Sequence, residues 1–189
     1  MKQQLNLRFA VLTAFLLLAA FSRIIPHPYN FSPLAIMGLF GAAYFTKKWQ
    51  AILLPLAATW LSDVFINNVV YAQYYPEFTW FYSGFYWVYG SYAVITILGF
   101  ALFNTVNLQR ILSGSILATS LFFLITNFGS FIGNPMYPQS FEGLMMSYAA
   151  GIPFLQNNFL GDLFYSAVLF GGFALAGKSL QFPAHVSKA

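Results

Sequence analysis

Long, almost uncharged apolar runs follow one another along the chain, separated by short segments that hold most of the polar residues. A helix that crosses a hydrocarbon core of about 30 Å needs about 20 mostly apolar residues. The runs predict six spans, at about 7–25, 33–46, 50–70, 86–106, 111–132 and 153–177. The second run is short, so this span is expected to be tilted or lengthened by the segment before it. Residues 139–150 are expected to form a short interfacial helix before the last span.

These runs are continuous and too long for a membrane barrel, whose strands alternate over segments of about 10 residues. The pattern therefore predicts an all-α integral membrane protein with one transmembrane domain over residues 1–189. The first run follows Lys2 and Arg8, as in a signal peptide. No convincing A-x-A cleavage site follows it and the rest of the chain is equally apolar, so we expect a retained helix.

Composition agrees with a membrane location. Only 6% of the 189 residues are charged and 59% are hydrophobic, whereas a soluble domain carries roughly 25% charged residues. This excludes a soluble enzyme, a nucleic-acid-binding protein and a disordered chain. The net charge is +4, but the basic residues are scattered and form no stripe for nucleic acid. The chain has no cysteine, which excludes disulfides, thiolate catalysis and cysteine-ligated metals.

The basic residues predict the orientation in the membrane, because cytoplasmic loops carry an excess of Lys and Arg. With six spans and a cytoplasmic N-terminus, seven of the eight basic residues lie inside and only Arg23 lies outside. The inside residues are Lys2, Arg8, Lys47, Lys48, Arg110, Lys178 and Lys188. Both termini are therefore expected in the cytoplasm, with the aromatic segment 71–92 at the outer face.

Polar side chains gather in the outer half of this arrangement. We expect ten of these and nearby aromatic residues to bind a substrate: Arg23, His27, Asn30, Asp63, Asn67, Tyr82, Tyr86, Tyr89, Asn127 and Asp162. Ionisable groups in a bilayer cost at least about 2–3 kcal/mol, so they face a cavity or a partner. A channel would need polar groups across the full thickness, which favours a cup open on one side. The alternative is a structural network in which Arg23 pairs with Asp63 or Asp162.

Twelve aromatic residues lie between Tyr71 and Tyr92. Part of this segment is expected to form an aromatic belt at the membrane surface. The density also favours a lid over a partly planar organic ligand, with Tyr82, Tyr86 and Tyr89 as its contacts.

Enzymatic chemistry has little support. No nucleophile–base pair and no phosphate-binding glycine loop accompany Asp63 and Asp162. His27 and His185 are expected on opposite sides of the membrane, which leaves no histidine metal site. We therefore expect no catalytic residues, no metal and no cofactor.

Four segments resemble a family of small bacterial membrane proteins that is similar to the S components of energy-coupling-factor (ECF) transporters. They are RIIPHPYNFSP (23–33), LPLAATWLSD (54–63), WVYGS (87–91) and FFLITNFG (122–129). The resemblance covers nearly the whole chain and includes Gly143-Leu144 and Pro153-Phe154.

The resemblance implies a six-helix subunit of the bacterial inner membrane that captures a vitamin-like small molecule at the outer face for uptake. In S components an Ala-x-x-x-Ala pattern on the first helix docks on the coupling subunit, and Ala10 and Ala14 match it. A solitary S component for cobalamin is the nearest functional analogue, but it binds cobalt through a cysteine. Cobalamin would therefore require His27 as its axial ligand here. Since the chain has no nucleotide-binding motif, ATP hydrolysis would belong to partner ATPases.

Two hypotheses from different classes remain open at this point. One is a substrate-binding subunit of a transporter. The other is a non-transporting scaffold or envelope-assembly protein, embedded in membrane lipid, whose outer polar cluster is purely structural.

Overall fold

The computed structural model describes residues 2–180 and 182, and the part described is helical without strands. The expectations for Lys188, His185 and the C-terminus fall outside these residues. The main helices are α1 (Lys2–Phe21), α2 (Leu34–Tyr44), α3 (Lys48–Phe65), α4 (Phe85–Leu102), α5 (Leu108–Phe131), α6 (Phe141–Ser166) and α7 (Gly172–Ser179). The short elements are the 3-10 helices η1 (Ser22–Ile24) and η3 (Ala72–Tyr74) and the π-helical η2 (Ile66–Val70) and η4 (Ala167–Gly171).

Five helical stretches are long and apolar enough to cross a membrane. They correspond to five of the six predicted spans, which confirms a helical, multi-pass membrane architecture. The sixth predicted span contains α2, which has only 11 residues. At 1.5 Å per residue this helix is about 16 Å long, roughly half the thickness of the hydrocarbon core.

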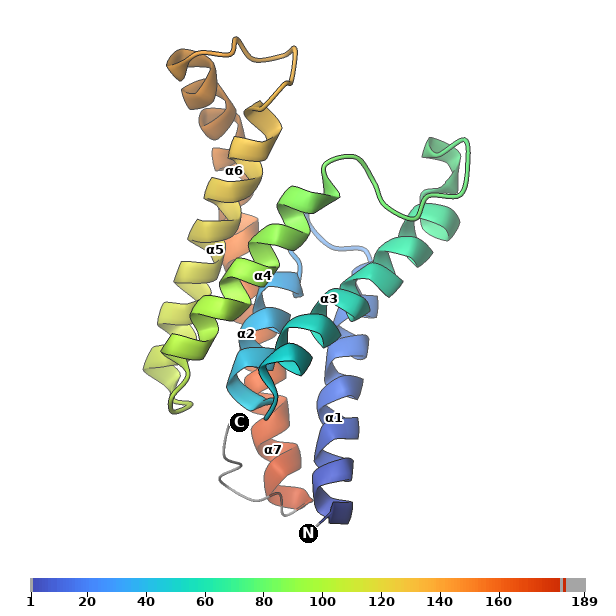
Figure 1. Ribbon diagram of the computed structural model, residues 1–189, viewed down its shortest axis with the longest axis vertical. Coiled ribbons are helices and arrows are strands. Elements are labelled where there is room, and N and C mark those ends of the chain that lie inside the picture. Colours follow the sequence, from blue (N-terminus) through green and yellow to red (C-terminus); the bar gives the residue numbers. More distant parts are fainter. Residues whose placement is uncertain (1, 181, 183–189) are drawn as a thin grey trace.

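Helices α1 to α6 run in alternating directions, and α7 continues in the direction of α6 (Figure 1). The start of α1, the α2–α3 and α4–α5 connections and the end of α7 lie at one end of the bundle, here called the terminal end. Residues 22–33, 71–84 and 132–140 lie at the opposite end, here called the cavity end.

The short helix α2 lies at the centre of the bundle and is buried on all sides, from Leu34 to Ala43. Its glycines allow this close packing. A Cβ atom on Gly41 would lie 2.7 Å from the carbonyl oxygen of Ala51 in α3, and one on Gly38 would overlap the hydroxyl of Thr96 in α4. Larger residues at these two positions would push α3 and α4 away from α2.

Towards the terminal end, the core is a cluster of packed aromatic rings around Phe40 of α2. The Phe40 ring lies 5.6 Å from that of Phe170 and 5.7 Å from that of Phe173, both edge-to-face. The Tyr44 ring lies 4.5 Å from that of Phe173 at an angle of 55°, and Arg8 of α1 donates to the Tyr44 carbonyl at 2.9 Å. This half of the bundle is therefore closed by packed rings.

The expected break between an interfacial helix and the last span is wrong. Helices α6, η4 and α7 form one continuous helical stretch of 39 residues, with Pro153 inside it. Its length of about 58 Å exceeds the thickness of the hydrocarbon core. Residues 141–152 are thus the first turns of this long helix, which pack against α5 where Ser147 donates to the Asn127 carbonyl at 2.8 Å.

Candidate functional site

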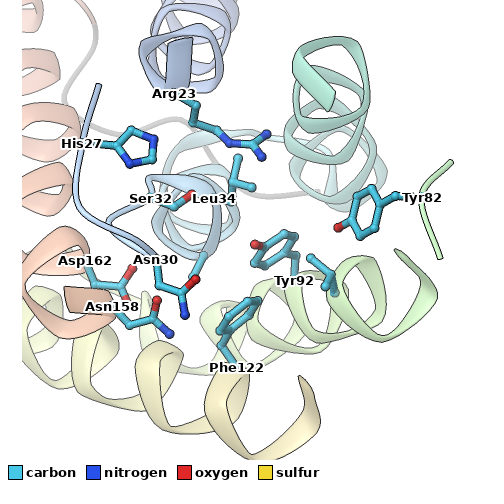
Figure 2. Close-up of a pocket in the computed structure, with 12 residues that line it drawn as sticks. Arg23, His27, Asn30, Ser32, Leu34, Tyr82, Tyr92, Phe122, Asn158 and Asp162 are labelled. Atoms are coloured by element: carbon cyan, nitrogen blue, oxygen red, sulfur yellow. The ribbon is translucent and has the colours of Figure 1, made fainter. Parts of the chain in front are cut away.

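A partly open cavity of about 280 Å³ lies between the helices, towards the cavity end (Figure 2). Side chains from η1, α2, α4, α5, α6 and the two loops preceding α2 and α4 surround it. It is lined by Arg23, His27, Asn30, Ser32, Leu34, Ala35, Tyr82, Val88, Tyr92, Phe122, Asn158 and Asp162.

The cavity exists because α2 begins inside the bundle, short of the cavity end. Leu34 and Ala35 of its first turn line the cavity, and the non-helical segment 25–33 fills part of the space between them and the cavity end. Asn30 turns this segment with a φ of 62°, a left-handed conformation that Asn tolerates better than most residues. Gly161 fixes the segment against α6, since a Cβ there would lie 2.9 Å from the amide nitrogen of Ser32.

Asp162 of α6 is the buried carboxylate of this cavity, with 4% of its surface exposed. One of its oxygens, Oδ2, accepts a hydrogen bond of 2.6 Å from Thr119 of α5. Asn158 lies one helical turn before it, and Figure 2 shows the two side chains next to each other with Asn30 beside them. Asp162 belongs to the 39-residue helical stretch that contains α6.

A second polar network fixes the helix ends next to the cavity. Arg23 Nη1 lies 2.6 Å from Asp63 Oδ1 of α3 and donates to Ser62 Oγ at 2.8 Å. Tyr89 of α4 donates to the other carboxylate oxygen of Asp63 at 2.7 Å. This confirms the prediction that Arg23 pairs with one of the two buried aspartates. Together these contacts tie η1, which follows α1, to α3 and α4.

Aromatic rings form the opposite side of the cavity. Tyr92 of α4 and Phe122 of α5 stack with centroids 5.4 Å apart and planes 6° from parallel. Tyr82 reaches the cavity from the loop before α4. Burial, and then the nearby Asp63 carboxylate, raise the pKa of Tyr82 well above its usual range, so the phenol keeps its proton.

Part of the remaining aromatic segment packs on α3, where Trp80 and Phe81 both contact the ring of Trp60. Trp80 stacks on Trp60 with centroids 6.1 Å apart and an angle of 10°, and Phe78 meets Trp80 edge-to-face at 4.7 Å. Asn68 fastens the segment to η2 through two hydrogen bonds with Thr79, of 2.7 and 2.9 Å. The segment is thus held to the protein by its own contacts, and Tyr82 is its residue that lines the central cavity.

Two further cavities adjoin the central one. The first, of about 350 Å³, lies between α5 and α6 and shares Asn30, Phe122 and Asn158 with it. The second, of about 390 Å³, lies between α4 and α5 and shares Tyr82 and Val88. Together they form a wide recess at the cavity end, with Asp162 in its central part.

A family of unknown function, DUF6580, matches residues 3–185. The chain belongs to the DUF6580 family. No curated protein and no solved structure matches it.

The DUF6580 chain brings five of the ten predicted substrate-binding residues to the central cavity: Arg23, His27, Asn30, Tyr82 and Asp162. Asn127 and Tyr86 line the adjoining cavities. Asp63 and Tyr89 belong to the network that holds Arg23. Asn67 is buried, and its amide nitrogen has no hydrogen-bond partner among the described residues.

Sequence reasoning missed Asn158, Tyr92 and Phe122 as cavity residues. A signal for Asn158 was present, because residues four apart share a face of a helix and Asn158 precedes Asp162 by four. The aromatic pair carried no such signal, since apolar helices contain aromatic residues on every face.

The described part of the DUF6580 chain holds no group of three or more His, Cys, Asp or Glu residues that could bind a metal. Its site instead offers hydrogen-bonding side chains, one buried carboxylate and flat apolar rings. This combination is typical of sites for small organic ligands.

Proposed function

We propose that this DUF6580 chain captures a vitamin-like small molecule at the outer face of the bacterial inner membrane, in the manner of an ECF transporter S component. The observation that carries the proposal is the one-sided cavity. Polar and aromatic side chains line it at one end of the bundle, and packed rings around Phe40 fill the other end. In this proposal the ligand enters from the cavity end.

The charge distribution supports an outward-facing cavity. Lys47, Lys48, Arg110 and Lys178 belong to connections or helix ends at the terminal end, and Arg23 belongs to the cavity end. Under the positive-inside rule the terminal end is cytoplasmic. The short helix α2 and the segment before it would then make the sixth crossing.

Uptake requires an energy source that the chain does not carry, because it has no nucleotide-binding motif. We propose that a coupling subunit with its ATPases supplies it. Ala10 and Ala14 are both exposed on α1, and small residues let a partner helix approach closely. A solitary mode of action is the alternative within this proposal.

A scaffold role is the second candidate, and one observation favours it. Arg23, Asp63 and Tyr89 satisfy one another within the protein, as a purely structural network would. The cavity beside that network distinguishes the two candidates, because a scaffold has no need to retain a small molecule there.

Mass spectrometry of the protein purified from bacterial membranes tests the proposal. We expect a small molecule to co-purify, and Tyr82→Leu to reduce the retained amount about tenfold, since one aromatic contact contributes on the order of 1–2 kcal/mol. Tyr74→Leu is the matched control, because Tyr74 lies in the same segment and is 70% exposed. A protein that retains no small molecule, in wild-type or variant form, would favour the scaffold.

A further inference from the structure

The two buried aspartates beside the cavity differ in their partners. Arg23 pairs with Asp63 at 2.6 Å, and this is the one ion pair among the described residues. Asp162 accepts a hydrogen bond from the hydroxyl of Thr119, and no basic side chain of the described residues pairs with it. The cavity therefore holds one carboxyl group that has no basic partner within the described part of the protein.

Burial makes this unpaired group costly. Asp162 is 4% exposed and belongs to a helical stretch long and apolar enough to cross a membrane. Ionisable side chains in membrane helices normally face a cavity or a partner, and buried carboxylates are normally paired. Its burial is explained if the partner is a bound ligand.

Side chains that can accept hydrogen bonds from a cation, or pack against its flat part, surround the Asp162 carboxylate. Asn158 and Asn30 lie beside Asp162 (Figure 2), and neither carboxamide makes a side-chain hydrogen bond to another described residue. Their oxygens can accept N–H groups together with Asp162. The rings of Tyr92 and Phe122 line the same cavity, and aromatic faces attract cations and flat ring systems.

The first turn of α2 also faces this cavity, and a helix N-terminus favours a negatively charged ligand. A helix N-terminus corresponds to about half a positive charge. Of the described residues, Asp162 is the one acidic side chain that lines the cavity, so a cationic ligand has a carboxylate partner there.

We propose that the ligand of this site is a compact organic cation, with N–H donors on a planar group, and that Asp162 is its counter-ion. This inference rests on the proposed function and adds the chemical class of the substrate. The cationic group would lie between Asp162, Asn158 and Asn30, with its planar part towards Tyr92 and Phe122.

Three probes of nearly equal shape test the charge: benzamidinium, benzamide and benzoate. Their binding to the detergent-solubilised full chain is measured by calorimetry at pH 7 and low salt. We expect benzamidinium to bind at least about tenfold more tightly than the other two, since a charge-assisted hydrogen bond contributes about 1.5–3 kcal/mol. Asp162→Asn should abolish this preference, and Glu77→Gln, which changes an exposed carboxylate, should keep it.

The charge preference of the wild-type protein decides the matter even if Asp162→Asn fails to fold. Equal or tighter binding of benzamide or benzoate would overturn the proposal that the ligand is a cation. A neutral or anionic molecule identified by mass spectrometry in the purified protein would overturn it too. Either result would leave the capture function intact. Absence of a co-purified molecule together with no binding of any probe would overturn both the capture function and the cation.

Discussion

The Arg23–Asp63 pair offers the sharpest test of what holds the cavity end together. Asp63→Asn keeps the size of the side chain but removes the charge that faces Arg23 at 2.6 Å. It also replaces the carboxylate oxygen that accepts from Tyr89 at 2.7 Å. Three helices lose a shared contact through one substitution.

The expected loss is about 3 kcal/mol in the free energy of unfolding. Weakening the Tyr89 bond accounts for about 0.6–1.7 kcal/mol, the range for hydrogen bonds between membrane helices. Leaving the guanidinium without its carboxylate adds on the order of 2 kcal/mol. This is less than the 3–5 kcal/mol of a fully buried pair, because the Arg23 side chain remains 19% exposed and can reach water.

Unfolding by sodium dodecyl sulfate in mixed micelles measures this loss. The double variant Arg23→Gln/Asp63→Asn should recover part of the stability, since it leaves no unpaired charge. Tyr89→Phe should lower the free energy of unfolding only by the contribution of the Tyr89 hydrogen bond, about 0.6–1.7 kcal/mol. A loss below about 1 kcal/mol for Asp63→Asn, or a double variant less stable than the single one, would refute this account of the pair.

Two further predictions concern the loop before α4 and the orientation. Asn68→Ala should cost about 1–3 kcal/mol and expose segment 71–84 to protease, because both hydrogen bonds to Thr79 are lost; proteolysis unchanged from wild type would contradict this. The chain has no cysteine, so single cysteines report sidedness directly. In intact cells a membrane-impermeant maleimide should label Glu77→Cys and should label Lys48→Cys only after permeabilisation; the reverse pattern would invert the proposed orientation.

The helical membrane architecture could be predicted because it depends only on the length of the apolar runs in the sequence. Five apolar stretches are long enough to cross, and their positions follow from the hydropathy. The pairing of Arg23 with a buried aspartate could be predicted too, because a charge in a bilayer needs a partner. The choice of Asp63 over Asp162 depended on helix packing, which hydropathy does not specify.

The continuity of the last helix could not be predicted for a related reason. Pro153 suggested the start of a new helix. In the structure the helix continues through Pro153 from Phe141, since a proline removes one amide donor and the neighbouring turns can maintain the helix. The extension contributes Ser147 and Gly151 to the cavity between α5 and α6, which the predicted span did not contain.

The position of the cavity can be traced to the prolines before α2. Pro28 and Pro33 have no amide hydrogen, and each disfavours the helical conformation in the residue before it. These prolines therefore prevent α2 from extending beyond Leu34 towards the cavity end. Two more helical turns would add about 11 Å of helix and fill the space between α4, α5 and α6. The segment 25–33 instead contributes His27, Asn30 and Ser32 to that space. The same residues that shorten the central helix therefore create the cavity and supply part of its polar lining.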